Sequence, residues 1–152
     1  MPKAAVKNEV KREETAFKKE KTPVICLAVS GLSSAFYDST VRPLVEGLHE
    51  IHVRIAVLER KSDDIPEDAD MIVFFSPNEE MLKKAWEQGV VPITDIFDSA
   101  IEDYNPNSEV GNAFIYKSKN AWAIYAAIIR AVETFKFPYD WKYIMRSCMK
   151  SA

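Results

Sequence analysis

Short apolar runs alternate along the chain with segments in which apolar residues recur every three or four positions. The runs are VICLAVS, HVRIAVL, MIVFF, VVPI and AFIY, at 24–30, 52–58, 71–75, 90–93 and 113–116. Continuous apolar runs of this length, bounded by turn residues, are typical of strands buried on both faces. The periodic segments predict helices at 37–51, 78–88, 95–101, 118–135 and 138–150.

Several helix ends carry residues that stabilise such ends. Asn78 precedes an acidic first turn and is expected to cap the helix that Gly89 ends. Pro138 suits the first turn of the last helix. The helix at 118–135 is apolar nearly all round, so we expect it to be well buried. We expect the three tryptophans to be core or half-buried anchors rather than platforms that stack on sugars; they are Trp86, Trp122 and Trp141.

Strands that alternate with helices indicate βαβ units and a parallel sheet. We therefore predict a Rossmann-like α/β domain over residues 23–152, with about five parallel strands and helices on both faces of the sheet. Residues 1–22 differ, with seven Lys or Arg, four Glu and only scattered apolar residues. They are interpreted as a flexible charged leader or, alternatively, as an arm that docks on an acidic partner.

Composition excludes several classes of function. The chain has 152 residues, of which 47% are hydrophobic, enough for a core, and its net charge of −3 does not favour nucleic-acid binding. Cys26 and Cys148 lie in apolar segments and are expected to be buried thiols. Two histidines without a Cys/His cluster argue against zinc. The longest apolar run, 121–129, is far shorter than the roughly 20 residues of a membrane span. We expect a cytoplasmic protein with no metal, no cofactor and no membrane partner.

In parallel sheets, ligands bind at the carboxyl ends of strands near the point where strand order reverses. The loops at 30–38, 58–63, 75–79 and 93–98 are therefore candidates. Ser30, Gly31, Ser33 and Ser34 could hold a phosphate through hydroxyls and backbone amides, although no complete glycine-rich phosphate motif is present. The acidic residues at 95, 98 and 102 could form a metal or acid/base site, or only a helix cap and a solvated face.

Residues 89–149 read GVVPITDIFDSAIEDYNPNSEVGNAFIY and continue through AWAIYAAIIRAVETF to WKYIMRSCM. This order resembles the carboxyl-terminal part of bacterial glycogen and plant starch synthases, glycosyltransferases of the GT-B fold. Upstream, LAVSGL is similar to that family's V-V-S-R-L strand and DADMIVFFSP to its A-D-x-F-L-x-P-S strand. The resemblance covers about 23–150, one half of a GT-B enzyme. The matched positions at 89–149 are Gly89, Pro92, Ile93, Asp103, Tyr104, Gly111, Phe114, Ala127, Ile128, Arg130, Ala131, Trp141 and Met149.

The resemblance also implies which ligand-holding residues have been replaced. In the family, an Arg and a Lys of S-R-L-x-x-Q-K-G bind the nucleotide diphosphate, whose negative charge grows in the transition state. Here those positions fall on Gly31 and near Phe36. A gapless match places Ser76 at the Glu of E-P-C-G-L and Asn78 at its Cys. Asp95 stands where the first glycine of T-G-G-L would let backbone approach a phosphate.

The resemblance therefore implies a retained scaffold without most of its ligand-holding residues, and without the other half that completes the catalytic cleft. We interpret the chain as a non-catalytic half-domain, a binding or assembly module. One alternative is the sugar-nucleotide-binding subunit of a split glycosyltransferase that uses ADP- or UDP-glucose for glucan synthesis. Another is a regulatory doubly wound domain of a different kind. The candidate nucleotide-binding residues are Ser30, Gly31, Ser33, Ser34, Asn78 and Asp95.

The last helix is the candidate partner surface. In the resembled family it packs across both halves, so a single half is expected to leave apolar surface around Trp141, Tyr143 and Met145. Exposed apolar patches of this kind mark protein interfaces. We therefore expect a protein partner or a homo-oligomer, with a sugar nucleotide as a further candidate ligand.

Overall fold

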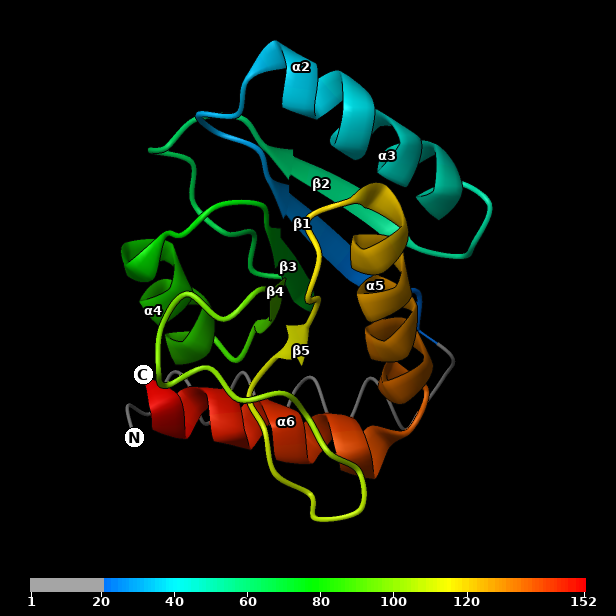
Figure 1. Ribbon diagram of the computed structural model, residues 1–152. Helices are drawn as coiled ribbons and strands as arrows, with labels where there is room; N and C mark the ends of the chain where they lie inside the picture. Colours follow the sequence, from blue (N-terminus) through cyan, green and yellow to red (C-terminus); the bar gives the residue numbers. More distant parts are fainter. Residues whose placement is uncertain (1–20) are drawn as a thin grey trace.

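A computed structural model describes residues 21–152 (Figure 1). Within them, five strands form one parallel sheet in the order β2-β1-β3-β4-β5. The strands are β1 (Val24–Ala28), β2 (Arg54–Leu58), β3 (Met71–Phe74), β4 (Val91–Thr94) and β5 (Phe114–Ile115). The predicted Rossmann-like sheet of about five parallel strands is thus confirmed.

The helices flank the sheet as two layers (Figure 1). On one face α3 contacts α5, and on the other α4 contacts α6. The bounds are α2 (Ser34–Phe36), the π-helical turn η1 (Tyr37–Val41), α3 (Arg42–Leu48), α4 (Glu79–Glu87), α5 (Ala121–Phe135) and α6 (Pro138–Ser151). The expected helices at 37–51, 78–88, 118–135 and 138–150 are therefore present, each within a few residues of its predicted ends.

The strand order reverses at β1, and this sets up the edge of the sheet where a ligand can bind. The chain leaves β1 for β2 on one side and returns to β3 on the other. Ala28 is in register with Leu58 of β2 and with Phe74 of β3. The carboxyl ends of these three strands are therefore level, and the loops that follow them lie next to one another.

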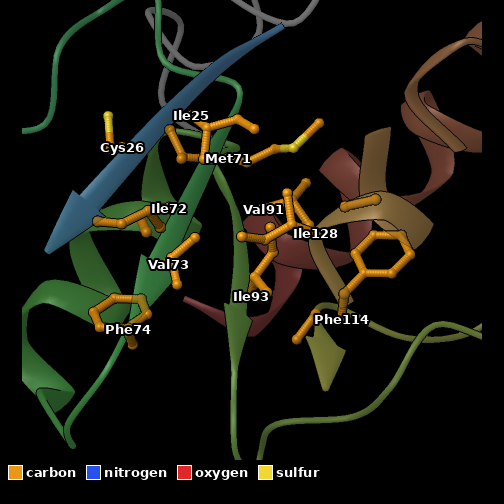
Figure 2. Close-up of a cluster of buried hydrophobic side chains, with 14 of the residues drawn as sticks. Ile25, Cys26, Met71, Ile72, Val73, Phe74, Val91, Ile93, Phe114 and Ile128 are labelled. Atoms are coloured by element: carbon orange, nitrogen blue, oxygen red, sulfur yellow. The ribbon is translucent and has the colours of Figure 1, made fainter. Parts of the chain in front are cut away.

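The central strands are buried on both faces, as their continuous apolar runs predict. Figure 2 shows Ile25, Met71 and Val91 on the side of the sheet that carries Ile128 of α5, whereas Cys26 points to the other side. All of these side chains are fully buried. The edge strand β2 is less covered, and Val57 is 42% exposed.

The first crossover helix is interrupted by a π-helical turn because of Pro43. The amide of Arg42 bonds to the carbonyl of Tyr37, five residues back, instead of the usual four. Proline has no N–H, and its ring would clash with the carbonyl of Ser39, four residues earlier. Widening the preceding turn removes that clash, so the helix continues as α3 without a sharp break.

Two expectations about helices were wrong. No helix forms at 95–101, because the Asp98 carboxylate accepts the amide of Ala100 at 2.8 Å and closes a local turn instead. The helix α5 is not buried all round, since Trp122 in its first turn is 84% exposed. Only Trp86 and Trp141 are core tryptophans, each 4% exposed.

Asn112 joins the long loop before β5 to three other segments. Its Oδ1 accepts the amide of Glu102 at 2.9 Å, while Nδ2 donates to the carbonyl of Ala100 at 2.8 Å and to Ser151 Oγ at 2.9 Å. Its own carbonyl accepts the Trp86 indole N–H at 3.1 Å. The loop is therefore attached to both α4 and α6.

Three residues matched to the resembled family have structural roles in the same loop. Asp103 pairs with Arg130 of α5 at 3.2 Å, and the Tyr104 hydroxyl donates to Asp140 of α6 at 3.2 Å. Gly111 has φ +124, and a Cβ there would lie 2.4 Å from the Tyr104 backbone. These residues hold the loop against the helices.

Most of the predicted charged leader, residues 1–20, lies outside the described residues. Lys21 lies 3.4 Å from the buried Asp70, whose carboxylate also accepts the amide of Val24 at 2.9 Å. The domain limits 1–22 and 23–152 stay predictions. Over residues 21–152, each helix is too short or too polar to cross a bilayer.

Candidate functional site

A cleft of about 390 Å³ lies at the carboxyl ends of β1, β2 and β3, which are in register with one another. Its volume is within the range of roughly 300–1,000 Å³ that is usual for small-molecule sites. The cleft occupies the point where strand order reverses, which is where open parallel sheets bind ligands. The residues that line it are Ala28, Ser30, Gly31, Glu59, Lys61, Phe74, Ser76, Pro77 and Asn78.

The turn after β1 brings backbone close to the cleft. The amide of Val29 donates to the carbonyl of Leu58 at 3.1 Å, and the amide of Leu32 donates back to the carbonyl of Val29 at 3.3 Å. Gly31 between them has φ +78, and a Cβ at this position would meet no atom within 4 Å. A left-handed glycine beside open space lets a ligand approach the main chain without a side chain in the way.

The loop after β3 forms a second wall, ending at Asn78. The side-chain oxygen of Asn78 accepts the amide of Met81 at 3.0 Å and so caps α4, as predicted. Within the described chain its Nδ2 has no partner and can donate into the cleft. Glu79 and Glu80 in the first turn of α4 already complement the helix dipole, so the helix end adds little attraction for an anion.

The loop after β2 supplies the two charged groups of the cleft, Glu59 and Lys61. Both are exposed, and neither forms an ion pair with any residue of 21–152. A local turn shapes this loop, because Asp63 accepts the amide of Arg60 at 2.9 Å and donates its own amide back to Arg60 at 3.0 Å. Lys61 is the one cation among the lining residues.

Sequence reasoning missed Glu59, Lys61 and Ser76 as cleft residues. The loop at 58–63 was a candidate by position. The run ERKSDD, however, has no pattern that distinguishes a charged side chain lining a cleft from one exposed to solvent. Only the register of β2 against β1 shows that this loop lies beside the turn that contains Ser30. Ser76 lies in the candidate loop at 75–79, but by residue it was named only as the position matched to a glutamate of the resembled family.

The structure brings together some of the predicted site residues and separates the others. Ser30, Gly31 and Asn78 all line the cleft. Ser33 instead caps α2, where its Oγ accepts the amide of Phe36 at 3.1 Å, and Ser34 is the first residue of that helix. Asp95 lies outside the lining, with a carboxylate oxygen 3.9 Å from the Lys119 ammonium.

The two positions that the resemblance assigns to diphosphate-binding cations hold no cation. Gly31 is part of the cleft floor. Phe36 packs edge-on against Phe75, with ring centroids 6.1 Å apart, and is half-buried against the core. The cation that does line the cleft, Lys61, comes instead from the loop after β2.

The tyrosine after β5 fixes the end of β3 beneath the cleft. The hydroxyl of Tyr116 donates to the carbonyl of Phe74 at 2.6 Å. Burial, and secondarily the charge of Asp95, raises the pKa of Tyr116 above its ordinary value. The neutral hydroxyl is therefore a permanent donor, and it joins β5 to the strand that carries one wall of the cleft.

The expected partner surface on α6 is mostly absent. Trp141 is 4% exposed and Met145 2% exposed, because α6 folds back on α4 and β4 of the same domain. The Trp141 ring packs on Phe114 and Phe135, with centroids 6.3 and 5.1 Å apart. Of the three predicted residues only Tyr143 is exposed, at 47%.

Comparisons by sequence identify no relative: no family model matches, and no curated protein matches. A comparison of structures finds a protein with a similar fold. The catalytic domain of starch synthase IV from Arabidopsis thaliana, solved bound to ADP and acarbose, superposes with a TM-score of 0.62 at 13% sequence identity. The alignment covers 97% of this chain and 39% of that one, so the chain spans well under half of the neighbour's length. At this identity the likeness concerns the fold, which is that of one GT-B half.

Proposed function

We propose that this chain is a non-catalytic binding module with the fold of a GT-B half-domain, and that its cleft holds a nucleotide or sugar nucleotide. The observation that carries the proposal is the cleft at the carboxyl ends of β1, β2 and β3. It lies at the reversal point of the sheet, and open backbone, hydroxyls, an amide and one cation converge on it.

These groups suit phosphate oxygens. Gly31 leaves the main chain accessible, Ser30 and Ser76 carry hydroxyls, and the Asn78 side chain has a free Nδ2. Lys61 adds the only positive charge among the lining residues. With one cation and one carboxylate in the cleft, we expect weak binding, with a Kd of about 1 mM, which corresponds to roughly −4 kcal/mol.

The residues that line the cleft also support the proposal that the chain is non-catalytic. Transfer of a sugar from a nucleotide requires cations that stabilise the charge on the departing diphosphate. Lys61 alone provides this in the cleft, and the half-buried Phe36 occupies one of the positions where the resemblance expects a cation. We therefore expect no transfer of glucose from ADP-glucose or UDP-glucose to glycogen by the chain alone.

The split-enzyme alternative shares this site and differs in the partner. It is favoured by the likeness to part of a starch synthase domain that was solved with ADP. It predicts that glucosyl transfer appears when a second chain with the other GT-B half is added, and that a Lys61→Ala variant of this chain lowers that activity. Transfer that is insensitive to Lys61→Ala would count against it.

The test of the binding proposal is a titration of ¹⁵N-labelled protein with ADP, ADP-glucose and UDP-glucose, followed by NMR. We expect shifts to cluster at 30–31, 59–61 and 76–78, and Lys61→Ala to weaken them. Lys150→Ala, which removes an exposed lysine outside the cleft, is the matched control and should leave them unchanged. If no resonance shifts at millimolar ligand, the cleft is not a nucleotide site.

We also propose that the chain assembles with a protein partner or with itself through the first turns of α6. Exposed aromatic side chains support this: Phe137 is 59% exposed and Tyr143 47%. Light scattering over a range of concentrations tests self-association, with Tyr143→Lys expected to lower the apparent mass. A constant monomer mass would rule out the homo-oligomer.

A further inference from the structure

The strand β2 lies at one edge of the sheet (Figure 1). Within residues 21–152, β1 is the only strand that pairs with β2, and the pairing is parallel. At one end of β2 the amide of Arg54 donates to the carbonyl of Pro23 at 2.9 Å. At the other end the carbonyl of Leu58 accepts the amide of Val29 at 3.1 Å. The main-chain groups of Arg54 and Leu58 therefore point toward β1.

The residues between these two ends alternate in direction. Successive residues of a strand point their main-chain N–H and C=O groups to opposite sides, so Ala56 bonds to β1 whereas Ile55 and Val57 face outward. No turn or loop hydrogen bond within residues 21–152 reaches these two residues. The outer side of β2 thus offers their N–H donors and C=O acceptors to a further strand.

The strand β2 lacks most of the features with which proteins protect an edge strand. Its sequence RIAVL has no proline or glycine, and Arg54 at its first position is its one charge. Val57 is 42% exposed. At the opposite edge of the sheet, by contrast, the amide of Ile115 in β5 donates to the Asp103 carboxylate at 3.0 Å. Within residues 21–152, the edge of β2 is therefore the one left open to a further strand.

We propose that two copies of this chain pair through β2, antiparallel about a two-fold axis at Ala56, and so join their sheets into one. With this register, Ile55 of each copy lies opposite Val57 of the other, and each such pair exchanges both of its main-chain hydrogen bonds. All the outward-facing groups of both strands are then satisfied. The Ala56 residues meet at the axis as a pair without hydrogen bonds, where two strands approach most closely and a small side chain fits.

An axis one residue earlier would satisfy fewer groups. With the axis at Ile55, Val57 would lie opposite Val53 of the second copy. The amide of Val53 already donates to the carbonyl of Ile51 at 3.0 Å, so it has no proton to offer. The Val57 carbonyl would then stay unpaired.

An axis one residue later would bring like charges together. With the axis at Val57, Arg54 would lie opposite Arg60 of the second copy, and like charges directly opposite destabilise a strand pair. A parallel pair in register would set Arg54 against Arg54. With the axis at Ala56, Arg54 faces the apolar Leu58 instead. Hydrogen bonding and charge thus select the same register.

The side chains favour a second copy over an unrelated strand. Ile55 is in register with Ile25, which Figure 2 shows on the α5 side of the sheet, so Ile55 and Val57 lie on that side as well. Each pair therefore packs one partly buried isoleucine against one exposed valine, and the two-fold axis repeats this contact. The contact is separate from the one proposed on α6, and it is independent of any ligand in the cleft.

The variant Val57→Pro tests the proposed pairing. Because the Val57 amide faces outward, proline removes no bond to β1, and the urea midpoint should stay near that of the wild type. Analytical ultracentrifugation should show the wild-type mass approaching twice 17.3 kDa as the concentration rises toward about 1 mM. In Val57→Pro the dissociation constant of the dimer should rise at least about tenfold, because each copy loses one donor. Ala56→Pro, which removes a bond to β1, should instead lower the urea midpoint.

A second variant does not depend on tolerance of proline. Val57→Lys keeps every main-chain group, but a lysine on an edge strand opposes pairing, so it should also weaken the dimer at least about tenfold. Val110→Lys is the matched control, because Val110 is 43% exposed and lies in the loop before β5. It should dimerise as the wild type does. Loss of the dimer in Val57→Lys alone would support the inference if Val57→Pro did not fold.

Two results would overturn the inference. One is a constant monomer mass for the wild type at every concentration. The other is a dimer that persists in both Val57 variants, and if Tyr143→Lys abolished that dimer, self-association would belong to α6. Neither result concerns the ligand of the cleft, which the NMR titration tests separately.

Discussion

Replacing Gly111 by alanine should cause a large loss of stability, because two separate penalties act at this position. The backbone has φ +124, a conformation that L side chains rarely adopt. The added Cβ would also lie 2.4 Å from Tyr104 Cα, 2.6 Å from Tyr104 N and 2.7 Å from the Asp103 carbonyl oxygen. All three atoms are backbone, so no side chain can rotate away to make room.

The magnitude follows from what has to move. Left-handed strain in a residue other than glycine is worth about 1–2 kcal/mol. Displacing Tyr104 also disturbs its amide bond to the Ala113 carbonyl at 2.9 Å and the neighbouring bond from Asn105 to Val110 at 2.8 Å, each worth about 1 kcal/mol. We therefore expect the free energy of unfolding to fall by about 3–4 kcal/mol, a large part of the roughly 5–15 kcal/mol of a typical domain.

Gly31 provides a matched control within the same chain. It also has a positive φ, +78, but a Cβ there meets nothing within 4 Å. Gly31→Ala should therefore lose only the conformational part, about 1 kcal/mol. Urea unfolding followed by tryptophan fluorescence measures both variants. If Gly111→Ala loses no more stability than Gly31→Ala, the close approach to Tyr104 does not restrict this position and the reasoning fails.

Three other predictions test packing, hydrogen bonding and titration. Trp141→Ala should lower the free energy of unfolding, measured with urea, by about 3–5 kcal/mol. Trp122→Ala, at a site that is 84% exposed, should change it by less than about 0.5 kcal/mol. Equal losses in the two variants would contradict this prediction. Asn112→Ala should lose about 2–3 kcal/mol because three side-chain hydrogen bonds vanish, with the exposed Asn107→Ala near zero as control. Burial, followed by the charge and hydrogen bond of Asp140, raises the pKa of Tyr104 from 10.0 to about 12. Between these two pH values the Tyr104 hydroxyl keeps its proton in the folded state but loses it in the unfolded chain. The free energy of unfolding, measured with urea at each pH, should therefore fall as the pH rises from 10 to 12. It should fall less in Tyr104→Phe.

Elements with strong local signals were predictable. The strands β1, β3 and β4 are continuous apolar runs, and a run buried on both faces has only one stable environment, the middle of a sheet. Asn78 and Gly89 define the ends of α4 through their own side-chain and backbone chemistry, so no distant residue is needed to explain them.

Segments were not predictable where local hydrogen bonds compete with helix formation, or where tertiary packing decides which side chains are buried. The apolar spacing at 95–101 suits a helix, but Asp98 satisfies the backbone locally and the chain turns instead. Trp122 has the spacing of a buried face, yet the first turn of α5 leaves it exposed. The apolar surface that a missing second half was expected to leave around Trp141 and Met145 is covered, because α6 packs on its own α4 and β4.

By itself, the sequence determined the class of fold and the edge of the sheet where a ligand could bind, since alternating strands and helices allow only a parallel sheet with its loops at the carboxyl ends. It also named Ser30, Gly31 and Asn78, which do line one cleft. Only the tertiary structure decided that Glu59 and Lys61 join them and that Asp95 does not. The physical reason is strand order: residues far apart in the chain become neighbours only after β2 and β3 pair on either side of β1.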